Sequence, residues 1–258
     1  MDQLLAIMLL QASLLSCNNN PISSSAVINN ERSTVINPYQ LIKAIPLPTG
    51  YKRVADDPGS FTGYLRNIRL KEQTTVHLYN GLPKQNQTAQ YAVLNISVGN
   101  IDLQQCADAV IRLRAEYLFA QDQFDQILFY DNDKTAYRFS SPYTRDNFNK
   151  YLNRVFGMCG SASLAKQLKP VGNFQDLKPG DVIIRGGFPG HAVMVMDVAV
   201  HASGKKIYLL AQSYMPAQDI HVLVNPMNTD LSPWYEVNDD KQIHTPEYSF
   251  TKNELKRW

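Results

Sequence analysis

The sequence predicts an α+β domain in which helices pack on an antiparallel sheet of hairpin-connected strands. Two observations predict this class. Apolar residues recur at helical intervals around residues 102–118 and 144–156, whereas the last third of the chain carries short apolar runs separated by turns with Gly or Pro. Helices that precede a run of hairpin-connected strands are typical of an α+β fold.

The N-terminus carries the features of an export signal. Residues 4–15 form an apolar run that is interrupted only by Gln11 and Ser13. A bilayer-spanning helix needs about 20 apolar residues, so this run is too short for a stable anchor but suits the core of a signal peptide. The run ends in the segment Leu-Leu-Ser-Cys at residues 14–17, which resembles the lipobox of bacterial lipoproteins, although the segment before the run holds Asp2 and no Lys or Arg.

The lipobox resemblance implies that Cys17 is acylated and becomes the mature N-terminus. The protein would then be exported and anchored to a membrane by its lipid, in the periplasm or at the cell surface. A buried N-terminal helix is the alternative for the same residues. Residues 18–36 are rich in Asn and Ser and lack periodic apolar residues, so we expect a flexible tether there. Residues 37–258 are then expected to form a single domain.

Composition and charge narrow the classes of function. The chain is 44% hydrophobic and 19% charged, as in ordinary soluble globular proteins. Its net charge of +2 is too small to favour nucleic acid or an acidic membrane surface as a partner. We therefore expect no nucleic-acid partner.

The domain is expected to begin with loops and two short strands, because Pro and Gly recur before residue 60. Residues 74–79 and 91–98 are rich in β-branched or aromatic residues, which favour strands. A long helix is predicted next, with Asp102 and Gln105 at the spacing of a capping box. Its apolar face consists of Leu103, Cys106, Ala107, Val110, Leu113, Tyr117 and Leu118.

The rest of the chain adds a second helix and the main strands. The second helix is predicted over residues 144–156, where Phe148, Tyr151, Leu152 and Val155 share one face. On the first helix, Arg112 and Glu116 are four residues apart and are expected to form an exposed ion pair. Strands are predicted over residues 181–184, 192–200, 207–211 and 220–224.

Cys106 and His191 are the residues whose positions suggest chemistry. Cys106 lies in the first turn of the predicted helix, where unpaired backbone N–H groups and the helix dipole favour an anion and should lower a thiol pKa. His191 begins a strand after the turn at residues 186–190. A histidine there is fixed by the backbone and open to a cleft, as a general base should be.

A third residue is needed to orient the imidazole. Asp197 is on the same strand as His191, but six residues of strand place it roughly 20 Å away, so we reject it. Gln212 on the next strand is the better candidate, because a neutral amide can hold a histidine tautomer. A tight turn at residues 203–204 would leave Gln212 too far along, so an offset register with a bulge or an asymmetric loop is required. Gln218 and Tyr214 are the reserve candidates.

The order of these pieces resembles the papain-like cell-wall hydrolases of the NlpC and CHAP type. In those families a cysteine opens a helix, a Pro-Gly-Asp strand follows, and Gly-His marks the base. The matching pieces here are Cys106, the segment Leu-Lys-Pro-Gly-Asp-Val at residues 177–182, Gly-His-Ala-Val at 190–193 and Ala-Gln-Ser at 211–213. The cysteine lacks the Asp-Cys-Ser neighbourhood of the NlpC type, and its distance from the Gly-Asp piece is longer than usual.

This resemblance implies a papain-like core over about residues 100–225 and hydrolysis of an amide or peptide bond, with cell-wall peptide as a candidate substrate. Cys106 would attack the carbonyl, His191 would carry the proton, and the Cys106 backbone N–H with Gln105 would hold the oxyanion. Over its whole length the chain resembles a family of bacterial (Bacteroidetes-type) lipoproteins of unknown function with Gln-Cys-Ala-Asp-Ala and Gln-Ser-Tyr-Met-Pro-Ala-Gln segments.

Other interpretations remain open. Cys106 is also on the apolar face, so it could be a core residue or form a disulfide with Cys159 in a purely structural lipoprotein. Cys159 precedes another short helix and is an alternative nucleophile. A non-catalytic lipoprotein of the same fold that binds a peptide or glycan is the main competing function. No metal or cofactor is expected, because the remaining histidines lack metal-ligand spacing: His77, His201, His221 and His244.

Overall fold

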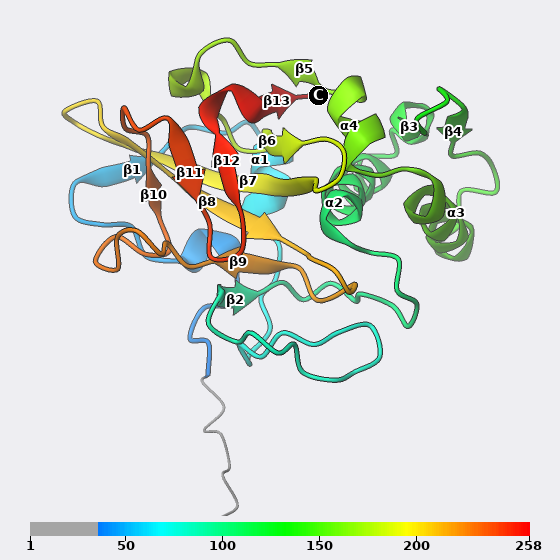
Figure 1. The fold of residues 1–258 in the computed structure, drawn as a ribbon, viewed down its shortest axis with the longest axis horizontal. Coiled ribbons are helices and arrows are strands. Elements are labelled where there is room, and N and C mark those ends of the chain that lie inside the picture. Colours follow the sequence, from blue (N-terminus) through cyan, green and yellow to red (C-terminus); the bar gives the residue numbers. More distant parts are fainter. Residues whose placement is uncertain (1–35) are drawn as a thin grey trace, which may run out of the picture. The chain divides into compact units, whose positions relative to one another are not determined.

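Strands β7 (His191–His201) and β8 (Lys206–Gln212) form the centre of an antiparallel sheet in the computed structural model, which describes residues 36–258 (Figure 1). The sheet has nine strands in the order β2-β9-β8-β7-β6-β13-β5, with β1 added beside β7 and β10 beside β8. The other strands of this sheet are β1 (Tyr51–Arg53), β2 (Gln90–Val93), β5 (Lys169–Pro170), β6 (Val182–Arg185), β9 (His221–Leu223), β10 (Tyr235–Glu236) and β13 (Leu255–Arg257).

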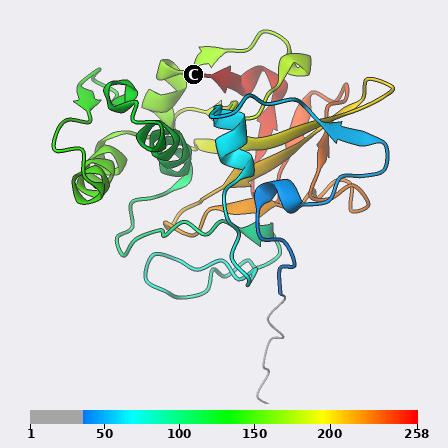
Figure 2. The same cartoon turned by 180° about the vertical axis from the view of Figure 1, so that it is seen from behind.

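Helices cover one face of this sheet. Helices α1 and α2 contact β7 from behind (Figure 2), and the hairpin of β11 and β12 crosses the opposite face (Figure 1). The α+β class predicted from the sequence is therefore correct. The α-helices of the described part are α1 (Phe61–Arg66), α2 (Cys106–Ala120), α3 (Arg145–Met158) and α4 (Ser161–Gln167). Short 3₁₀ helices and two small hairpins complete it: η1 (Ile42–Ala44), η2 (Phe124–Gln126), η3 (Phe174–Asp176), η4 (Lys252–Glu254), β3 (Leu128–Tyr130) with β4 (Ala136–Arg138), and β11 (Gln242–His244) with β12 (Ser249–Thr251).

Strand β7 is buried on both faces, which explains its continuous apolar sequence. Ala192 and Met194 belong to the core cluster on the helical side. Val193 and Val195 belong to a second cluster that includes Phe250 of the β11–β12 hairpin. His191 has the same strand parity as Val193 and Val195, so its side chain is on the hairpin side of the sheet.

A register shift in β7 aligns the two central strands. Val198 pairs with Tyr208, but Met194 pairs with Ala211, because the register shifts by one residue between Val195 and Asp197. This is the offset that a bulge produces, and such an offset was the condition for bringing Gln212 toward His191.

Asp197 is fully buried and paired with two arginines at the other end of β7. Its carboxylate accepts from Arg53 Nε at 2.6 Å and Arg66 Nε at 2.7 Å, and its Oδ1 also accepts from the backbone N of Val198 at 2.9 Å. The ion pairs tie β7 to β1 and to α1. The position of Asp197 agrees with its exclusion as a partner of His191.

The strand predicted over residues 74–79 is wrong. Only isolated bridges occur there, from His77 to Pro83 and from Leu78 to Gln218. The reason is that the side chain of Gln87 takes the place of a neighbouring strand: its Oε1 accepts from the backbone N of Val76, and its Nε2 donates to the Val76 carbonyl. The strand predicted over residues 91–98 is the shorter β2.

The predicted start of the first helix is also wrong, because α2 begins at Cys106 rather than near Asp102. The Asp102 carboxylate accepts from Gln105 Nε2 at 3.1 Å and from the backbone N of Ala217 at 2.7 Å, so it joins two loops instead of capping a helix. The cap is formed one turn later, where the backbone N of Gln105 donates to Asp108 Oδ2 at 3.0 Å.

Other predictions for the helices are confirmed. The second helix is α3, whose cap is Thr144, the Oγ1 of which accepts from the backbone N of Asn147. Arg112 and Glu116 form the expected ion pair at 2.8 Å, but it is not exposed as predicted, because the two side chains are only 17% and 12% exposed. Residues 36–258 belong to one compact unit, and within it no helix is both long and apolar enough to cross a bilayer. The predicted signal peptide, Cys17 and nearly all of the tether lie outside the described residues.

Candidate functional site

The candidate site is where the central strands of the sheet end, close to the start of α2. Strand β6 ends and β7 starts here, since Arg185 pairs with His191. Strand β8 also ends here and β9 starts, since Gln212 pairs with His221. A cavity of about 490 Å³ opens here. Both Cys106 and His191 line it, together with parts of α4, the loop at residues 186–190 and the β8–β9 loop. The topology thus brings the predicted nucleophile and base to one cavity.

Cys106 is the first residue of α2 and is half-buried. The backbone amides of Ala107, Ala192 and Cys106 itself favour its thiolate and lower the thiol pKa, as expected at a helix N-terminus. Burial opposes them more strongly, with a further contribution from the nearby Asp108 carboxylate, and raises the pKa of Cys106 to about 11. The predicted lowering of the thiol pKa is therefore wrong: Cys106 is a neutral thiol at pH 7.

His191 is buried among aromatic rings. Its ring centroid is 4.7 Å from that of Tyr214, 5.0 Å from that of Tyr248 and 5.7 Å from that of Phe250. Burial lowers the pKa of His191 to about 4, although the hydrogen bond to Gln212 opposes this shift. The imidazole is therefore neutral at pH 7 and can accept a proton.

Gln212 holds one nitrogen of this imidazole. The Nε2 of His191 and the Oε1 of Gln212 are 2.8 Å apart, and Gln212 is on the strand next to His191. Continuing the register from Met194 and Ala211 sets His191 opposite Tyr214 and Gln212 diagonally across from it. The structure therefore brings Gln212 to the predicted position.

Glu247, which the sequence did not single out, fixes the orientation of the Gln212 amide. Gln212 Nε2 donates to Glu247 Oε2 at 2.8 Å. A carboxylate only accepts, so the amide nitrogen must face Glu247 and the amide oxygen must face His191. His191 Nε2 consequently carries the proton and donates to Gln212. The unprotonated nitrogen of the ring is Nδ1.

The polar network continues behind Gln212. Lys84 Nζ donates to Glu247 Oε2 at 2.6 Å, and Asn86 Nδ2 donates to Glu247 Oε1 at 3.1 Å. His221 is fully buried and lies 3.5 Å from Gln212 Nε2 through its own Nε2. Burial lowers the pKa of His221 to about 4, so this second imidazole is neutral as well. In the sequence, only the charge and the length of its side chain could have suggested Glu247 as a partner of Gln212, because the two residues are 35 positions apart.

The remaining predicted residues have different surroundings. Gln105 lines the cavity, but its Nε2 donates to Asp102. Tyr214 lines the cavity beside His191, whereas Gln218 is buried and its backbone carbonyl accepts from the hydroxyl of Ser213. Tyr214 thus faces the candidate base, and Gln218 supports the loop.

Cys159, the alternative nucleophile, lines the same cavity from the end of α3. It belongs to the hydrophobic core, and burial raises its thiol pKa to about 12. Both Cys106 and Cys159 are free thiols. Cys159 is therefore less accessible than Cys106. Within residues 36–258 neither thiol makes a hydrogen bond to the imidazole of His191, whose Nε2 is bonded to Gln212.

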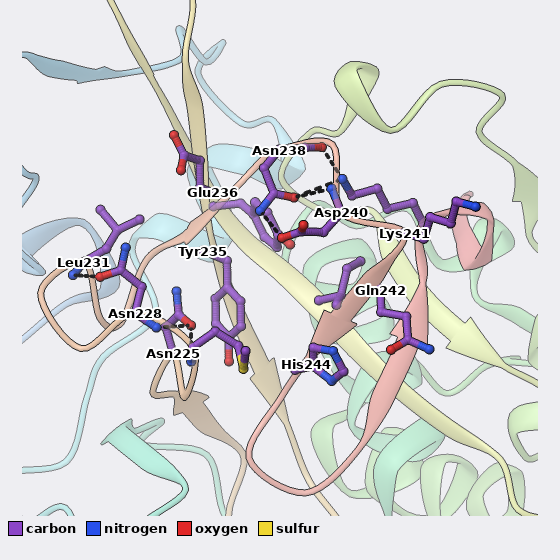
Figure 3. A pocket seen from close by; sticks show the side chains of 14 residues that line it. Asn225, Asn228, Leu231, Tyr235, Glu236, Asn238, Asp240, Lys241, Gln242 and His244 are labelled. Atoms are coloured by element: carbon purple, nitrogen blue, oxygen red, sulfur yellow. Dashed lines mark hydrogen bonds between the residues drawn. The ribbon is translucent and has the colours of Figure 1, made fainter.

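A larger cavity, of about 670 Å³, lies between the β9–β10 connection and the β11–β12 hairpin (Figure 3). Its three asparagines stabilise the local turns. Asn225 Oδ1 accepts from the backbone N of Met227, Asn228 Oδ1 accepts from the backbone N of Leu231, and Asn238 Nδ2 donates to Asp240. Neither Cys106 nor His191 lines this cavity.

Metal chemistry has no evident site in the described part of the chain. Residues 36–258 contain no group of three His, Cys, Asp or Glu side chains that could hold a metal ion. The reactive side chains that line the cavity at Cys106 include a thiol and an imidazole.

Comparison with known proteins identifies a family without an assigned activity. The pattern of a family described as "Domain of unknown function (4846)" matches residues 41–142 and 130–257. None of the curated proteins and none of the solved structures matches this chain.

Proposed function

Because this chain belongs to the family of that domain of unknown function (4846), its activity has to be inferred from the site, and we propose that it is a cysteine hydrolase that cleaves an amide or peptide bond. The observation that supports this most is the cavity shared by Cys106 and His191, in which Gln212 fixes the histidine tautomer. The arrangement is similar in order to the papain-like NlpC and CHAP hydrolases. We accordingly propose a papain-like core over about residues 100–225.

The proposed reaction starts from a neutral pair. Cys106 Sγ forms a bond to the carbonyl carbon while its proton passes to Nδ1 of His191. The C–N bond then breaks, and His191 returns the proton to the leaving amine. Water, deprotonated by the same nitrogen, hydrolyses the thioester to a carboxylate and restores the thiol. The backbone amides of Cys106 and Ala107 are the proposed donors to the oxyanion, with Gln105 as a further donor.

Acylation by an activated ester tests this proposal directly. The full chain is treated with p-nitrophenyl acetate, and its peptides are analysed by mass spectrometry. We expect the acetyl group on Cys106 and not on Cys159, and a much lower rate of acylation in His191→Ala. Equal labelling of the two cysteines, or a rate indifferent to His191, would refute the catalytic pair.

Gln212 and Glu247 should act as one unit. Gln212→Ala frees the imidazole to rotate, and Glu247→Ala lets the amide flip, so each should lower kcat on the order of 100-fold with little change in KM. Because Glu247 acts through Gln212, the double variant should lose no more than Gln212→Ala alone. Kinetics of the three variants decide this. If the loss of kcat in the double variant equals the product of the two single losses, Glu247 does not act through Gln212 and has only a structural role.

A binding protein of the same fold is the second candidate function. The thiol pKa of about 11 favours it, because a neutral thiol is a weak nucleophile until a base removes its proton. In that case the cavity would hold a peptide or glycan without turnover, and Cys106→Ala would leave its affinity unchanged.

We further propose that the domain is exported and held at a membrane by a lipid on Cys17, with cell-wall peptide as a candidate substrate. The segment Leu-Leu-Ser-Cys supports the anchor. Cys17→Ala should release the protein from the membrane fraction and abolish labelling by a fatty-acid probe, whereas Ser16→Ala should do neither. Unchanged labelling of Cys17→Ala would contradict the anchor.

A further inference from the structure

Two large apolar side chains stand exposed at the rim of the Cys106 cavity. Phe188 is 100% exposed and Met215 is 58% exposed, and both line this cavity. They come from different loops, at residues 186–190 and 213–218. Exposed apolar groups that gather at a concave site commonly mark a binding surface, whereas single ones scattered over a protein do not. We call these two residues the apolar rim.

The loop that carries Phe188 is fixed on both sides of it. Ser161 Oγ donates to the carbonyl of Gly187, and Tyr248 donates through its hydroxyl to the carbonyl of Pro189 at 3.0 Å. Gly190 packs so closely that a Cβ there would clash with the Gly187 carbonyl and with Ser161. The loop is thus well anchored, yet the Phe188 side chain has no packing partner of its own.

The loop that carries Met215 is fixed in the same way. The hydroxyl of Ser213 donates to the carbonyl of Gln104 at 2.9 Å, and the backbone N of Ala217 donates to Asp102 Oδ1 at 2.7 Å. Both bonds connect this loop to the segment directly before Cys106. Two anchored loops that line one cavity therefore each carry an exposed apolar side chain.

The charge of the cavity limits what it can accept. Of its lining residues, all of which are in the described part, two carry carboxyl groups, Asp102 and Asp108, and none is Lys or Arg. Asp108 is buried, its Oδ1 has no hydrogen-bond partner among the described residues, and burial raises its pKa well above the usual value. A carboxylate on a ligand would therefore meet no counter-charge in this cavity. The aromatic and thioether side chains favour an uncharged apolar group instead.

We infer that the cavity selects peptides or amides with a large, uncharged apolar side chain beside the bond to be cleaved, held between Phe188 and Met215. This inference rests on the proposed function and gives its substrate class. The cavity volume of about 490 Å³ is within the range of about 300–1,000 Å³ that small ligands occupy. A concave site of this size favours a side chain over a flat partner surface, and its charge disfavours peptides rich in carboxylates.

Binding to an inactive variant separates this inference from catalysis. Full-length Cys106→Ala is titrated with three N-acetylated, C-amidated tripeptides of sequence Ala-X-Ala, in which X is Phe, Glu or Lys. We expect the Phe peptide to bind at least about 10-fold more tightly than the other two, because burying an aromatic side chain is favourable. The Glu side chain meets no counter-charge, and the carboxylate of Asp102 is already engaged by Gln105 and Ala217 and is less available to Lys. Equal or tighter binding of the Glu or Lys peptide would overturn the inference.

Variants of the rim complete the test. Phe188→Ala and Met215→Ala should each weaken binding of the Phe peptide several-fold. Met227→Ala is the matched control, since Met227 is 70% exposed at the other cavity, and it should change nothing. If both rim variants bind the Phe peptide as tightly as the parent protein does, the inference is overturned because the rim is then not a binding site. If the rim variants instead lose binding to phosphatidylglycerol vesicles, the inference is overturned in favour of a membrane contact.

The two proposals fail in different ways. If the Phe peptide binds selectively but the wild-type chain leaves it intact, the hydrolase proposal fails and the selectivity stands. If the wild-type chain hydrolyses all three peptides at the same rate, the hydrolase proposal stands and the selectivity fails.

Discussion

Cys106→Ala should abolish hydrolysis of a susceptible amide, and His191→Ala should lower kcat/KM on the order of 1,000-fold. The first variant removes the atom that bonds to the carbonyl carbon. The second removes the base, and since the Cys106 thiol pKa is about 11, very little thiolate is present at pH 7 without it. Steady-state kinetics of the full chain measure both effects.

The pH profile of the wild-type chain tests the same pair. Protonation of His191 removes the base, and its pKa is lowered to about 4, so activity should fall only as the pH drops through about 4. A free histidine would give this loss near 6.5. An acid limb close to 6.5 would mean that His191 is more exposed to water in the working protein than its burial indicates.

Cys159→Ala is the control for both experiments. Cys159 lines the cavity but packs in the core, so its removal should leave the rate and the pH profile unchanged while it lowers stability by about 1 kcal/mol or more. Retained activity in Cys106→Ala together with lost activity in Cys159→Ala would exchange the roles of the two thiols.

Asp197→Ala should lower the free energy of unfolding by about 3–5 kcal/mol, the largest stability effect expected of a single substitution here. Asp197 is 0% exposed and is the shared partner of Arg53 and Arg66. Its removal leaves the side chain of Arg66, which is nearly as buried, with Asp56 as its remaining ion-pair partner among the described residues and a 3.5 Å bond to the Val198 carbonyl. Urea unfolding followed by circular dichroism measures the change.

A surface pair provides the matched control for that experiment. Glu236→Ala removes the partner of Lys205 in an ion pair of 3.6 Å whose side chains are 66% (Lys205) and 34% (Glu236) exposed, so it should cost less than about 1 kcal/mol. A comparably small loss in Asp197→Ala would show that the buried ion pairs contribute little to stability beyond the cost of their own desolvation.

The class of the fold and the order of its central elements follow from hydrophobic patterns in the sequence. Hydrophobic periodicity identified α2 and α3, because their apolar residues pack in the core. Helix α3 buries one face, whereas α2 is enclosed almost all round. The apolar runs identified β6 to β9, because these strands are buried. The pattern failed at residues 74–79, where the side chain of Gln87 supplies the hydrogen bonds of a missing strand neighbour. A side chain that takes the place of a neighbouring strand leaves no periodic signal in the sequence.

The sequence also brought out Cys106, His191 and Gln212, because a helix start and adjacent strand ends can be read from local patterns. Whether Gln212 reaches His191 depended on the one-residue register shift between Val195 and Asp197, which the sequence could only state as a condition. The apolar rim was not predicted, because an exposed phenylalanine in a Gly- and Pro-containing loop has the same sequence signal as a buried one.

The protonation states and the role of Glu247 depend on the three-dimensional arrangement of the chain. A helix N-terminus alone would lower the Cys106 pKa, but the desolvation that raises it to about 11 comes from elements that are distant in the chain. Glu247 reaches Gln212 from the β11–β12 hairpin, which folds across the sheet from 35 residues further along. Charge and burial depend on distances in space, whereas the sequence records only distances along the chain.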